Sequence, residues 1–316
     1  MLSRTAGNLF WIARYMERAE TAARLLEVGA RNSLIPSSQG HRSEWDSLLL
    51  AVGSADAFAK KYGDPVQRNV ESHLFFDRDN PSSVVSCITA ARENARIVRT
   101  ALTSQVWDTI NAAFEDLRQM ERQPRSELDL SRMTEWTMRQ TAMMRGAIEA
   151  TQLRGDGYDF LNIGYYLERA DSTARLLDVK YYVLLPRVEF VGSGLDNYQW
   201  TTLLRAVSSH RAFHWAYGGD VTEAKIAHFL VLNPRCPRSL ITCADGLVTH
   251  LDRLDRGYGR SGKARSQARS MLAGLAETDV DDIFDKGLHE FLSSFLVENG
   301  KLATEIHECY LNGDIR

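Results

Sequence analysis

The spacing of apolar residues predicts helices along almost the entire chain. Residues 5–30, plotted at about 100° per residue as in an α-helix, place a broad apolar side opposite a charged side. Trp45, Leu48, Leu49 and Val52 follow the i, i+3, i+4, i+7 spacing of a helix with one buried stripe. No stretch of the sequence shows the sustained alternation that is typical of a β-strand. The pattern therefore predicts an all-α protein.

Capping residues and turns set the predicted ends of these helices. Ser3 is the predicted N-cap of the first helix, because a serine side chain accepts a hydrogen bond from a free backbone N–H. Ser83 and Ser239 are predicted to do the same, each shortly after an Asn-Pro turn. Gly63 and Gly218 are predicted to end single helices that begin near the tryptophans at 45 and 200. Further helices are predicted through Arg118, over 130–153, to about 255, over 264–275 and over 280–311.

The same pattern occurs twice along the chain. Residues 14–26 and 165–177 match in register, at polar as well as apolar positions. A Gly-Asp-Gly sequence at 155–157 is the predicted linker between the copies. We therefore predict a multi-helix bundle built from two tandem copies of a roughly 150-residue helical unit, 1–155 and 156–316, packed as one globular domain.

Composition narrows the class of protein. The 316 residues are 44% hydrophobic and 25% charged, which is typical of globular proteins. The formal net charge of −3 provides no general attraction for nucleic acid or an acidic membrane. The four cysteines have no zinc-ligand spacing, and no apolar run approaches the about 18 residues of a membrane span. We expect a cytoplasmic protein that binds neither nucleic acid nor a membrane.

Charged residues at matched positions of the two copies are the strongest sign of a functional site. Apolar matches are explained by packing, whereas polar residues on solvated faces drift freely after a duplication. The matched polar pairs are Glu17/Glu168, Arg18/Arg169, Glu20/Asp171, Thr21/Ser172 and Arg24/Arg175. Within the first helix, Glu17 is within reach of Arg14 and Thr21, and Glu20 is within reach of Arg24.

Two interpretations fit this charged set. In the first, it is a buried network of ion pairs that fixes how the two copies dock. In the second, it is a polar cleft in which arginines, including Arg14, hold a carboxylate or a phosphate. Glu17 or Glu168 would then be the general acid or base of an enzyme. Ala13 and Gly164, at the matching site next to Arg14 and Tyr165, are small enough for close helix approach.

One charged segment has no counterpart in the second copy. Arg92, Glu93, Asn94 and Arg96 lie on the helix after the Asn80-Pro81 turn. The arginines at 92, 96 and 99 share one face of that helix. Both an ordinary salt-bridged surface and a binding site fit this stripe, and we include it among the predicted binding residues.

Other chemical motifs are incomplete. Residues 257–263 imitate the GxxxxGK phosphate loop, but alanine follows where serine or threonine is required, and no strand precedes them. His210 and His214 have the i, i+4 spacing of a metal pair, without an evident acidic partner. Cys87 and Cys243 lie among apolar residues and are predicted to be core. We expect no metal site, no cofactor and no cysteine nucleophile.

The Glu-Arg blocks resemble the alpha-E family, which is named for its Glu-Arg motif. The resemblance rests on residues 2–20, 80–81, 91–96 and 167–175, and it extends over essentially the whole chain. It implies a bacterial all-helical protein of unestablished activity. Members of the family tend to be encoded beside, or fused to, a circularly permuted ATP-grasp ligase, often together with a transglutaminase-like cysteine peptidase. ATP-grasp enzymes make amide bonds through acyl phosphates.

The resemblance therefore implies a function in peptide or amino-acid conjugation. We expect a non-catalytic partner or substrate-presenting subunit of an ATP-grasp amide ligase, with the charged residues as its recognition surface. The alternative is an enzyme of the same pathway that uses the Glu/Arg cleft. A structural role for the charged set, with the function elsewhere, is a third hypothesis.

Overall fold

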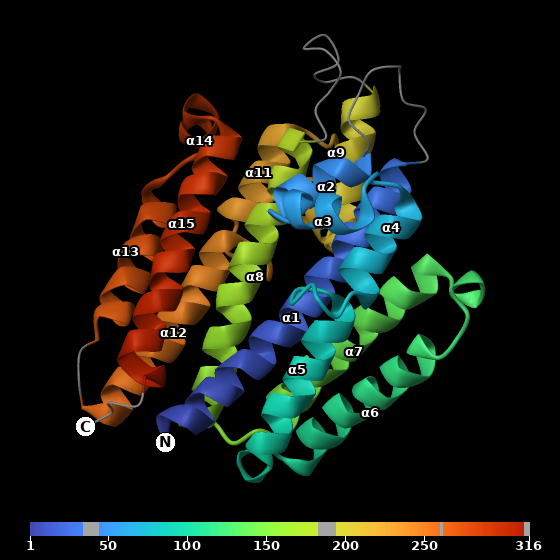
Figure 1. The fold of residues 1–316 in the computed structure, drawn as a ribbon. Coiled ribbons are helices and arrows are strands. Elements are labelled where there is room, and N and C mark those ends of the chain that lie inside the picture. The colour runs from blue at the N-terminus through green and yellow to red at the C-terminus, as the bar shows by residue number, and fades with distance from the viewer. Residues whose placement is uncertain (34–43, 183–193, 260–261, 313–316) are drawn as a thin grey trace.

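Two long helices cross at the centre of the molecule. The computed structural model describes residues 1–33, 44–182, 194–259 and 262–312. Within these ranges the chain forms helices and no β-strand, which confirms the all-α prediction. The central helices are α1 (Ser3–Asn32) and α8 (Asp156–Tyr182) (Figure 1). No helix of the described chain is long and apolar enough to cross a membrane.

The helices of the first half surround α1. They are α2 (Glu44–Ala51), α3 (Ala55–Tyr62), α4 (Gln67–Glu71), the π-helical η1 (Ser72–Phe76), α5 (Val84–Ile97), η2 (Arg99–Ala101), α6 (Ser104–Glu121), η3 (Arg125–Glu127) and α7 (Leu130–Thr151). Helices α5 and α7 pack directly on α1, and α6 packs against both of them. The short helices α2 to α4 lie near one end of α1 (Figure 1).

The helices of the second half surround α8 in a similar way. They are α9 (Gly194–Ala206), α10 (His210–Tyr217), α11 (Glu223–Val231), α12 (Leu240–Tyr258), α13 (Lys263–Glu277), α14 (Val280–Lys286), α15 (Leu288–Ile306) and η5 (His307–Leu311). Helices α12 and α15 pack on α8, and α13 packs against both. Helix α1 also contacts α9, and α8 contacts α2, so each central helix touches the other half.

Small residues allow α1 and α8 to approach each other closely. Gly164 lies against the backbone carbonyl of Phe10, and a Cβ atom at position 164 would overlap with that carbonyl. Ala19 and Ala170 are fully buried. The predicted close approach is confirmed at Gly164, and it brings the charged residues of the two helices within hydrogen-bonding distance.

Several predicted helix ends are shifted. Ser3 is not an N-cap, because the helix already begins at Ser3 and the cap position is Leu2, whose carbonyl accepts the first helical hydrogen bond. Ser83 and Ser239 are confirmed as N-caps, and each accepts a hydrogen bond from the backbone N–H three residues on. The linker between the halves is shorter than predicted because α8 begins at Asp156.

Three predicted helices are each divided in two. Gly53, with φ of 68°, separates α2 from α3, and Ser208, with φ of 56°, separates α9 from α10. Gly287, with φ of 93°, separates α14 from α15. A residue with positive φ ends an α-helix, whereas apolar spacing continues across such a break and hides it.

Candidate functional site: a charged interface and its cavity

Reciprocal ion pairs join α1 to α8. Glu17 accepts hydrogen bonds from Nε and Nη2 of Arg169, at 2.9 and 3.0 Å. Glu168 accepts hydrogen bonds from Nε and Nη2 of Arg18, at 2.6 and 3.0 Å. Each Glu-Arg pair therefore bridges to the other helix, because consecutive helical residues point in different directions.

Two further contacts differ from the expectation within α1. Arg14 donates from Nε to Glu168, at 2.6 Å, rather than to Glu17. The Thr21 hydroxyl donates to the backbone carbonyl of Glu17 and also hydrogen-bonds to the hydroxyl of Ser172. The expected i, i+4 pairs of Glu20 with Arg24 and of Asp171 with Arg175 are confirmed. The Glu17 carboxylate therefore bonds to Arg169 and Arg238 rather than to Arg14, and Glu17 contacts Thr21 only through its backbone carbonyl.

On the second-half side, Arg238 closes the network. It lies in the turn before α12, and its Nη1 donates to Glu17 at 3.2 Å while its Nη2 donates to Glu20. Arg24 donates from Nε to Glu20 at 2.8 Å, and from Nη1 to the carbonyl of Ala206. Arg238 is only 5% exposed. We call Glu17, Glu20, Arg24, Arg169 and Arg238 the closed cluster.

On the first-half side, the matching acids are less enclosed. Asp171 accepts a hydrogen bond from Nε of Arg175 at 2.7 Å, and these two side chains are 26% and 33% exposed. Arg175 also donates from Nη1 to the carbonyl of Ala51 at 3.4 Å. Glu168 is buried between Arg14 and Arg18.

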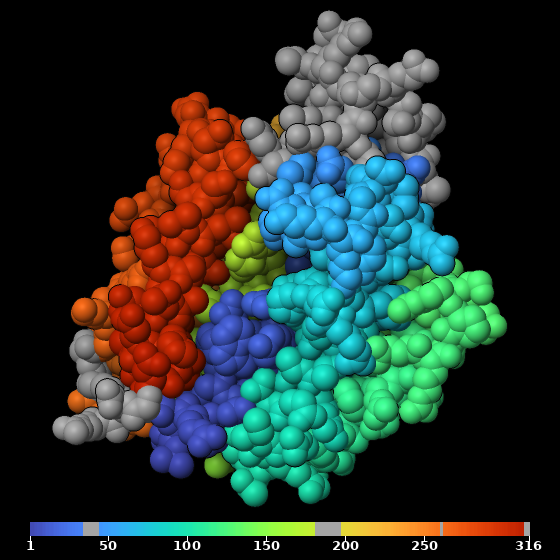
Figure 2. All heavy atoms as spheres, viewed as in Figure 1, coloured from blue at the N-terminus to red at the C-terminus, as the bar shows by residue number. Residues whose placement is uncertain are grey.

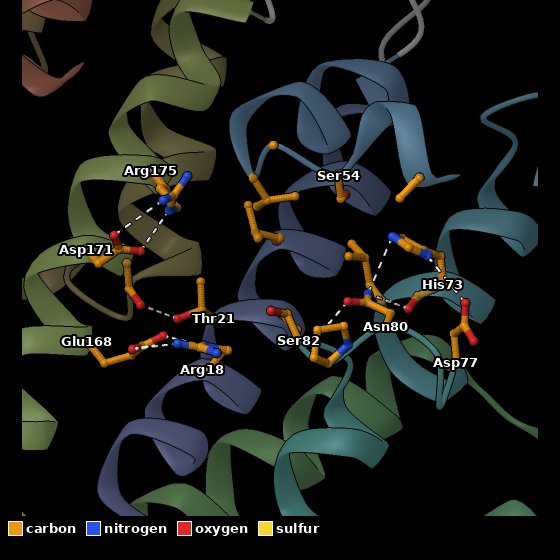
Figure 3. Close-up of a pocket in the computed structure, with 18 of the residues that line it drawn as sticks. Arg18, Thr21, Ser54, His73, Asp77, Asn80, Ser82, Glu168, Asp171 and Arg175 are labelled. Atoms are coloured by element: carbon orange, nitrogen blue, oxygen red, sulfur yellow. Dashed lines mark hydrogen bonds and ion pairs between the residues drawn. The ribbon is translucent and has the colours of Figure 1, made fainter. Parts of the chain in front are cut away.

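A cavity of about 580 Å³ lies beside Glu168 and Asp171. One side is formed by α1 and α8, and the other by α3, η1 and the turn before α5 (Figure 3). The surface is hollowed here, with α8 visible between α3 and the C-terminal helices (Figure 2). The charged residues of the first side, called the positive wall, are Arg14, Arg18, Glu168, Asp171 and Arg175. The polar residues of the second side, called the negative wall, are Ser54, Lys61, His73, Asp77, Asp79, Asn80 and Ser82.

The two walls carry opposite net charge. Three arginines face two carboxylates on the positive wall, which leaves one positive charge in excess. On the negative wall Lys61 bonds to Asp77 and Asp79 at 2.6 and 2.7 Å, which leaves one negative charge in excess. Burial lowers the pKa of His73, so this imidazole is neutral at pH 7 and does not change the balance.

The arginines keep the buried carboxylates ionised. Burial alone would raise the pKa of Glu168, but Arg14 and Arg18 outweigh burial and hold that pKa below its usual value. The pKa of Glu20 is lowered in the same way, against burial, chiefly by Arg238 and Arg24. A carboxylate with a lowered pKa is a weak base at neutral pH. Glu168 is therefore better suited to holding charge than to moving protons.

The predicted site residues fall into three groups. Five of them form the positive wall, namely Arg14, Arg18, Glu168, Asp171 and Arg175. Four belong to the closed cluster, namely Glu17, Glu20, Arg24 and Arg169. Four lie on α5 and do not line the cavity, namely Arg92, Glu93, Asn94 and Arg96. On α5, Glu93 pairs with Arg92 at 2.6 Å and with Arg96 at 2.8 Å.

Arg238 and the residues of the negative wall were not among the predicted site residues. Identical charges at matched positions do not reveal Arg238, because Ser82 stands at the matching place, directly before the N-cap serine of the next helix. The segment from His73 to Asn80 is two residues longer than the one from His228 to Asn233, and the longer segment holds Asp77 and Asp79. Differences between the halves were the signal for both features.

The cysteines at matched positions are core residues, as predicted. Cys87 and Cys243 are both fully buried. Burial raises the pKa of each thiol to about 12. Both are therefore protonated at neutral pH and unsuited to nucleophilic attack.

The remaining motifs add no further site to the described chain. The Nε2 atoms of His210 and His214 are 3.4 Å apart, and no group of three metal-ligating side chains occurs among the described residues. In the segment that imitates a phosphate loop, α12 continues to Tyr258 and Lys263 already begins α13. Residues 260–261 of that segment lie outside the described ranges.

Comparison with known proteins identifies the family. The model of Alpha-E, a predicted alpha-helical domain with a conserved ER motif, matches residues 1–311. Uncharacterised proteins of Mycobacterium bovis and Mycobacterium tuberculosis are 22% identical over 312 residues, and the match covers 93% of this chain. The chain spans only 35% of the length of these relatives. No solved structure matches the chain. The two Glu-Arg blocks, paired across α1 and α8, belong to a chain that is a member of the Alpha-E family.

Proposed function

We propose that this chain is a non-catalytic, substrate-presenting subunit of an ATP-grasp amide ligase system. In this proposal the cavity holds a free amino acid or a peptide end. The observation that carries the proposal is the pair of oppositely charged walls around a cavity of about 580 Å³. That volume lies within the range of about 300–1,000 Å³ that small-molecule sites occupy. A zwitterion presents both charges that such walls attract.

The positive wall can bind a carboxylate. Arg14 bonds to Glu168 through Nε alone, and Arg18 through Nε and Nη2. These contacts leave terminal N–H groups of both guanidinium groups without a bond to Glu168, and both side chains line the cavity. Arginine is well suited to a carboxylate because its planar group donates two parallel hydrogen bonds.

The negative wall can bind an ammonium group. Asp77 is buried in the wall and Asp79 is largely exposed at its edge. Lys61 neutralises only one of these two charges. The excess negative charge therefore favours a cation on this side.

The family and the length of the relatives support a ligase partner. Members of the family tend to be encoded beside, or fused to, a circularly permuted ATP-grasp ligase. The matched relatives are far longer than this chain, which leaves room for a fused domain in them. The transglutaminase-like peptidase is a second proposed partner. Because the ligase consumes ATP, we propose that the complex is cytoplasmic.

Calorimetric titration tests the binding part of the proposal. Free amino acids and dipeptides should bind, whereas their N-acetylated or C-amidated forms should bind at least about tenfold more weakly, since a charge-assisted hydrogen bond is lost. Arg18→Glu should abolish binding. Equal affinities for free and capped ligands, or no binding of either, would refute it.

Co-expression with an ATP-grasp ligase of the kind encoded beside members of the family tests the partner part. We expect the two chains to co-purify in near-equal amounts, and ATP turnover by the ligase to require the Alpha-E chain. A ligase that is fully active alone, and does not co-purify, would refute this part without affecting the binding result.

An enzyme of the same pathway is the alternative, because Glu168 borders the cavity. It predicts that the chain alone converts an amino-acid conjugate and that Glu168→Gln removes this activity. The lowered pKa of Glu168 favours the binding role instead.

We also propose that the two halves, 1–155 and 156–316, arose by duplication. Several contacts support this. Arg24 bonds to the carbonyl of Ala206 just as Arg175 bonds to that of Ala51, and Thr21 meets Ser172, its match in the other half. Aligned relatives should then show the same residue preferences at matched positions of the two halves, and unrelated preferences would contradict a duplication.

A further inference from the structure

The two halves differ at the residue that precedes the N-cap of the helix packed on each central helix. Arg238 precedes Ser239, the N-cap of α12, and Ser82 precedes Ser83, the N-cap of α5. Arg238 extends into the interface and contacts Glu17 and Glu20. Ser82 is short and lines the cavity. The turn before α12 is also longer, with seven residues from Asn233 to Ser239 against four from Asn80 to Ser83. An arginine side chain thus enters the interface in one half, whereas a cavity lies beside the short serine in the other.

Both sides hold three arginines and two carboxylates, so they differ in contacts and not in charge. The contacts of Arg238 show which contact is missing on the cavity side. In the closed cluster, Glu20 is bonded by Arg238, by Arg24 and by the Thr141 hydroxyl at 2.9 Å. Its match, Asp171, has Arg175 as its only bonded partner among the described residues.

Arg14 replaces only part of what Arg238 does. Glu168 receives its second guanidinium from Arg14, as Glu17 receives its own from Arg238. What is missing is a second guanidinium bonded to Asp171, which would correspond to the bond between Arg238 and Glu20. Asp171 is also one methylene shorter than Glu20, which leaves more room for an incoming group.

We propose that the cavity selects a ligand with a cationic side chain, a guanidinium or primary ammonium group on an aliphatic stem, which binds beside Asp171 as Arg238 binds beside Glu20. This inference rests on the proposed binding function and adds the ligand class. The apolar lining supports it, because Ala22, Leu25, Val52 and Leu74 provide a surface on which a methylene stem packs. Arginine, ornithine and lysine, free or at a peptide end, belong to this class.

Titration with matched ligands tests the class. Arginine should bind at least about tenfold more tightly than citrulline, which has the same shape without the charge, and than alanine. Agmatine, which lacks the carboxylate, should keep part of the affinity. Asp171→Asn should reduce the preference for arginine over citrulline. Equal binding of arginine, citrulline and alanine would overturn this inference and leave the proposed function standing, whereas binding of none of them would overturn both.

Filling the cavity from within provides a second test. In Ser82→Arg, the new side chain should occupy the place beside Asp171, abolish arginine binding and raise the thermal midpoint. Ser82→Met fills similar space without charge, so it should weaken binding but should not raise the midpoint. Ser82→Ala is the control that should keep full affinity. A Ser82→Arg protein that folds and binds arginine as tightly as the original chain would overturn the inference.

The reverse change can be made in the other half. Arg238→Ser should lower the thermal midpoint, because Glu17 and Glu20 lose a buried partner. Millimolar agmatine should raise the midpoint of this variant more than that of the original chain. If agmatine raised the thermal midpoint of both proteins equally, a free guanidinium would not bind where the Arg238 side chain had been removed, and this result would contradict the proposal.

Discussion

The two sides of the α1–α8 interface carry the same charged motif in different surroundings. On one side Arg238 completes a cluster in which every carboxylate is buried and paired. On the other, Ser82 leaves a cavity next to Glu168 and Asp171. The charged motif alone therefore does not make a site. The sides differ at the residue before the N-cap of the adjoining helix and in the turn before that helix, which runs over seven residues from Asn233 to Ser239 but over four from Asn80 to Ser83. They also differ in the longer first-half segment that brings Asp77 and Asp79.

The comparison also indicates how the motif supports the site. One bidentate pair on each side, Arg169 with Glu17 and Arg18 with Glu168, holds α1 against α8. The same crossing positions Arg18 and Arg175 at the cavity. The interpretation as a network of ion pairs between the halves agrees with these contacts, whereas the interpretation as a ligand-binding cleft stays a prediction, which the cavity makes possible.

Removing a carboxylate from each side should have the largest effect and should separate the sides. Glu17→Ala should lower the free energy of unfolding by about 3–5 kcal/mol, because it leaves Arg169 and Arg238 buried without a full set of partners. Glu168→Ala should cost less, about 1–3 kcal/mol, since Arg14 and Arg18 border the cavity. Urea unfolding measures both. Equal losses would show that the two sides are energetically alike.

The close approach of the helices gives the next effect. Gly164→Ala should destabilise the fold by about 1–3 kcal/mol, because the new methyl group meets the backbone of Phe10, which cannot move freely. Gly146→Ala is the matched control. Its Cβ would have nothing within 4 Å, so it should stabilise α7 by about 0.5–1 kcal/mol. Similar thermal midpoints for both variants would contradict the packing at Gly164.

Acid should act on the charged interface through its carboxylates. The pKa values of Glu20 and Glu168 are lower in the folded chain than the usual 4.5, so the unfolded chain binds protons first as the pH falls. Their stabilising contribution is complete above pH 4.5 and is lost as the pH falls through the folded pKa values. The urea midpoint should therefore decline below about pH 4.5, and less steeply in Glu168→Gln than in the original chain. A midpoint independent of pH in this range would contradict the ionised network.

The fold could be predicted from the sequence because apolar spacing reports helices directly. The breaks at Gly53 and Ser208 could not, since a single positive φ leaves the spacing unchanged. The matched charges identified α1 and α8 as important, but their partners depend on which helices meet. Glu17 bonds to Arg169 and Arg238, which are 152 and 221 positions away in the chain, rather than to Arg14.

The cavity itself was not predictable from matched residues. It lies where the halves differ, at Ser82 and Arg238, in the length of the turn before the next helix, and in the segment before Asn80. The charged residues that match between the two halves identified the α1–α8 interface. The residues that differ between the halves lie at the cavity.

The smallest effect on stability is expected for a substitution on α5. The same substitution distinguishes ligand binding from partner binding. Arg96 is 60% exposed and pairs with Glu93 within the same helix, so Arg96→Glu should change the free energy of unfolding by no more than about 0.5 kcal/mol. It should also leave amino-acid affinity unchanged, because α5 does not line the cavity through Arg96. Arg18→Glu, at the positive wall, should abolish that affinity. If Arg96→Glu weakens ligand binding as strongly as Arg18→Glu, the ligand does not bind in the cavity. If Arg96→Glu instead keeps ligand affinity but no longer co-purifies with the ligase, the arginine stripe on α5 is the docking face. In that case the stripe, which has no counterpart in the second half, binds the partner, and the cavity binds the substrate.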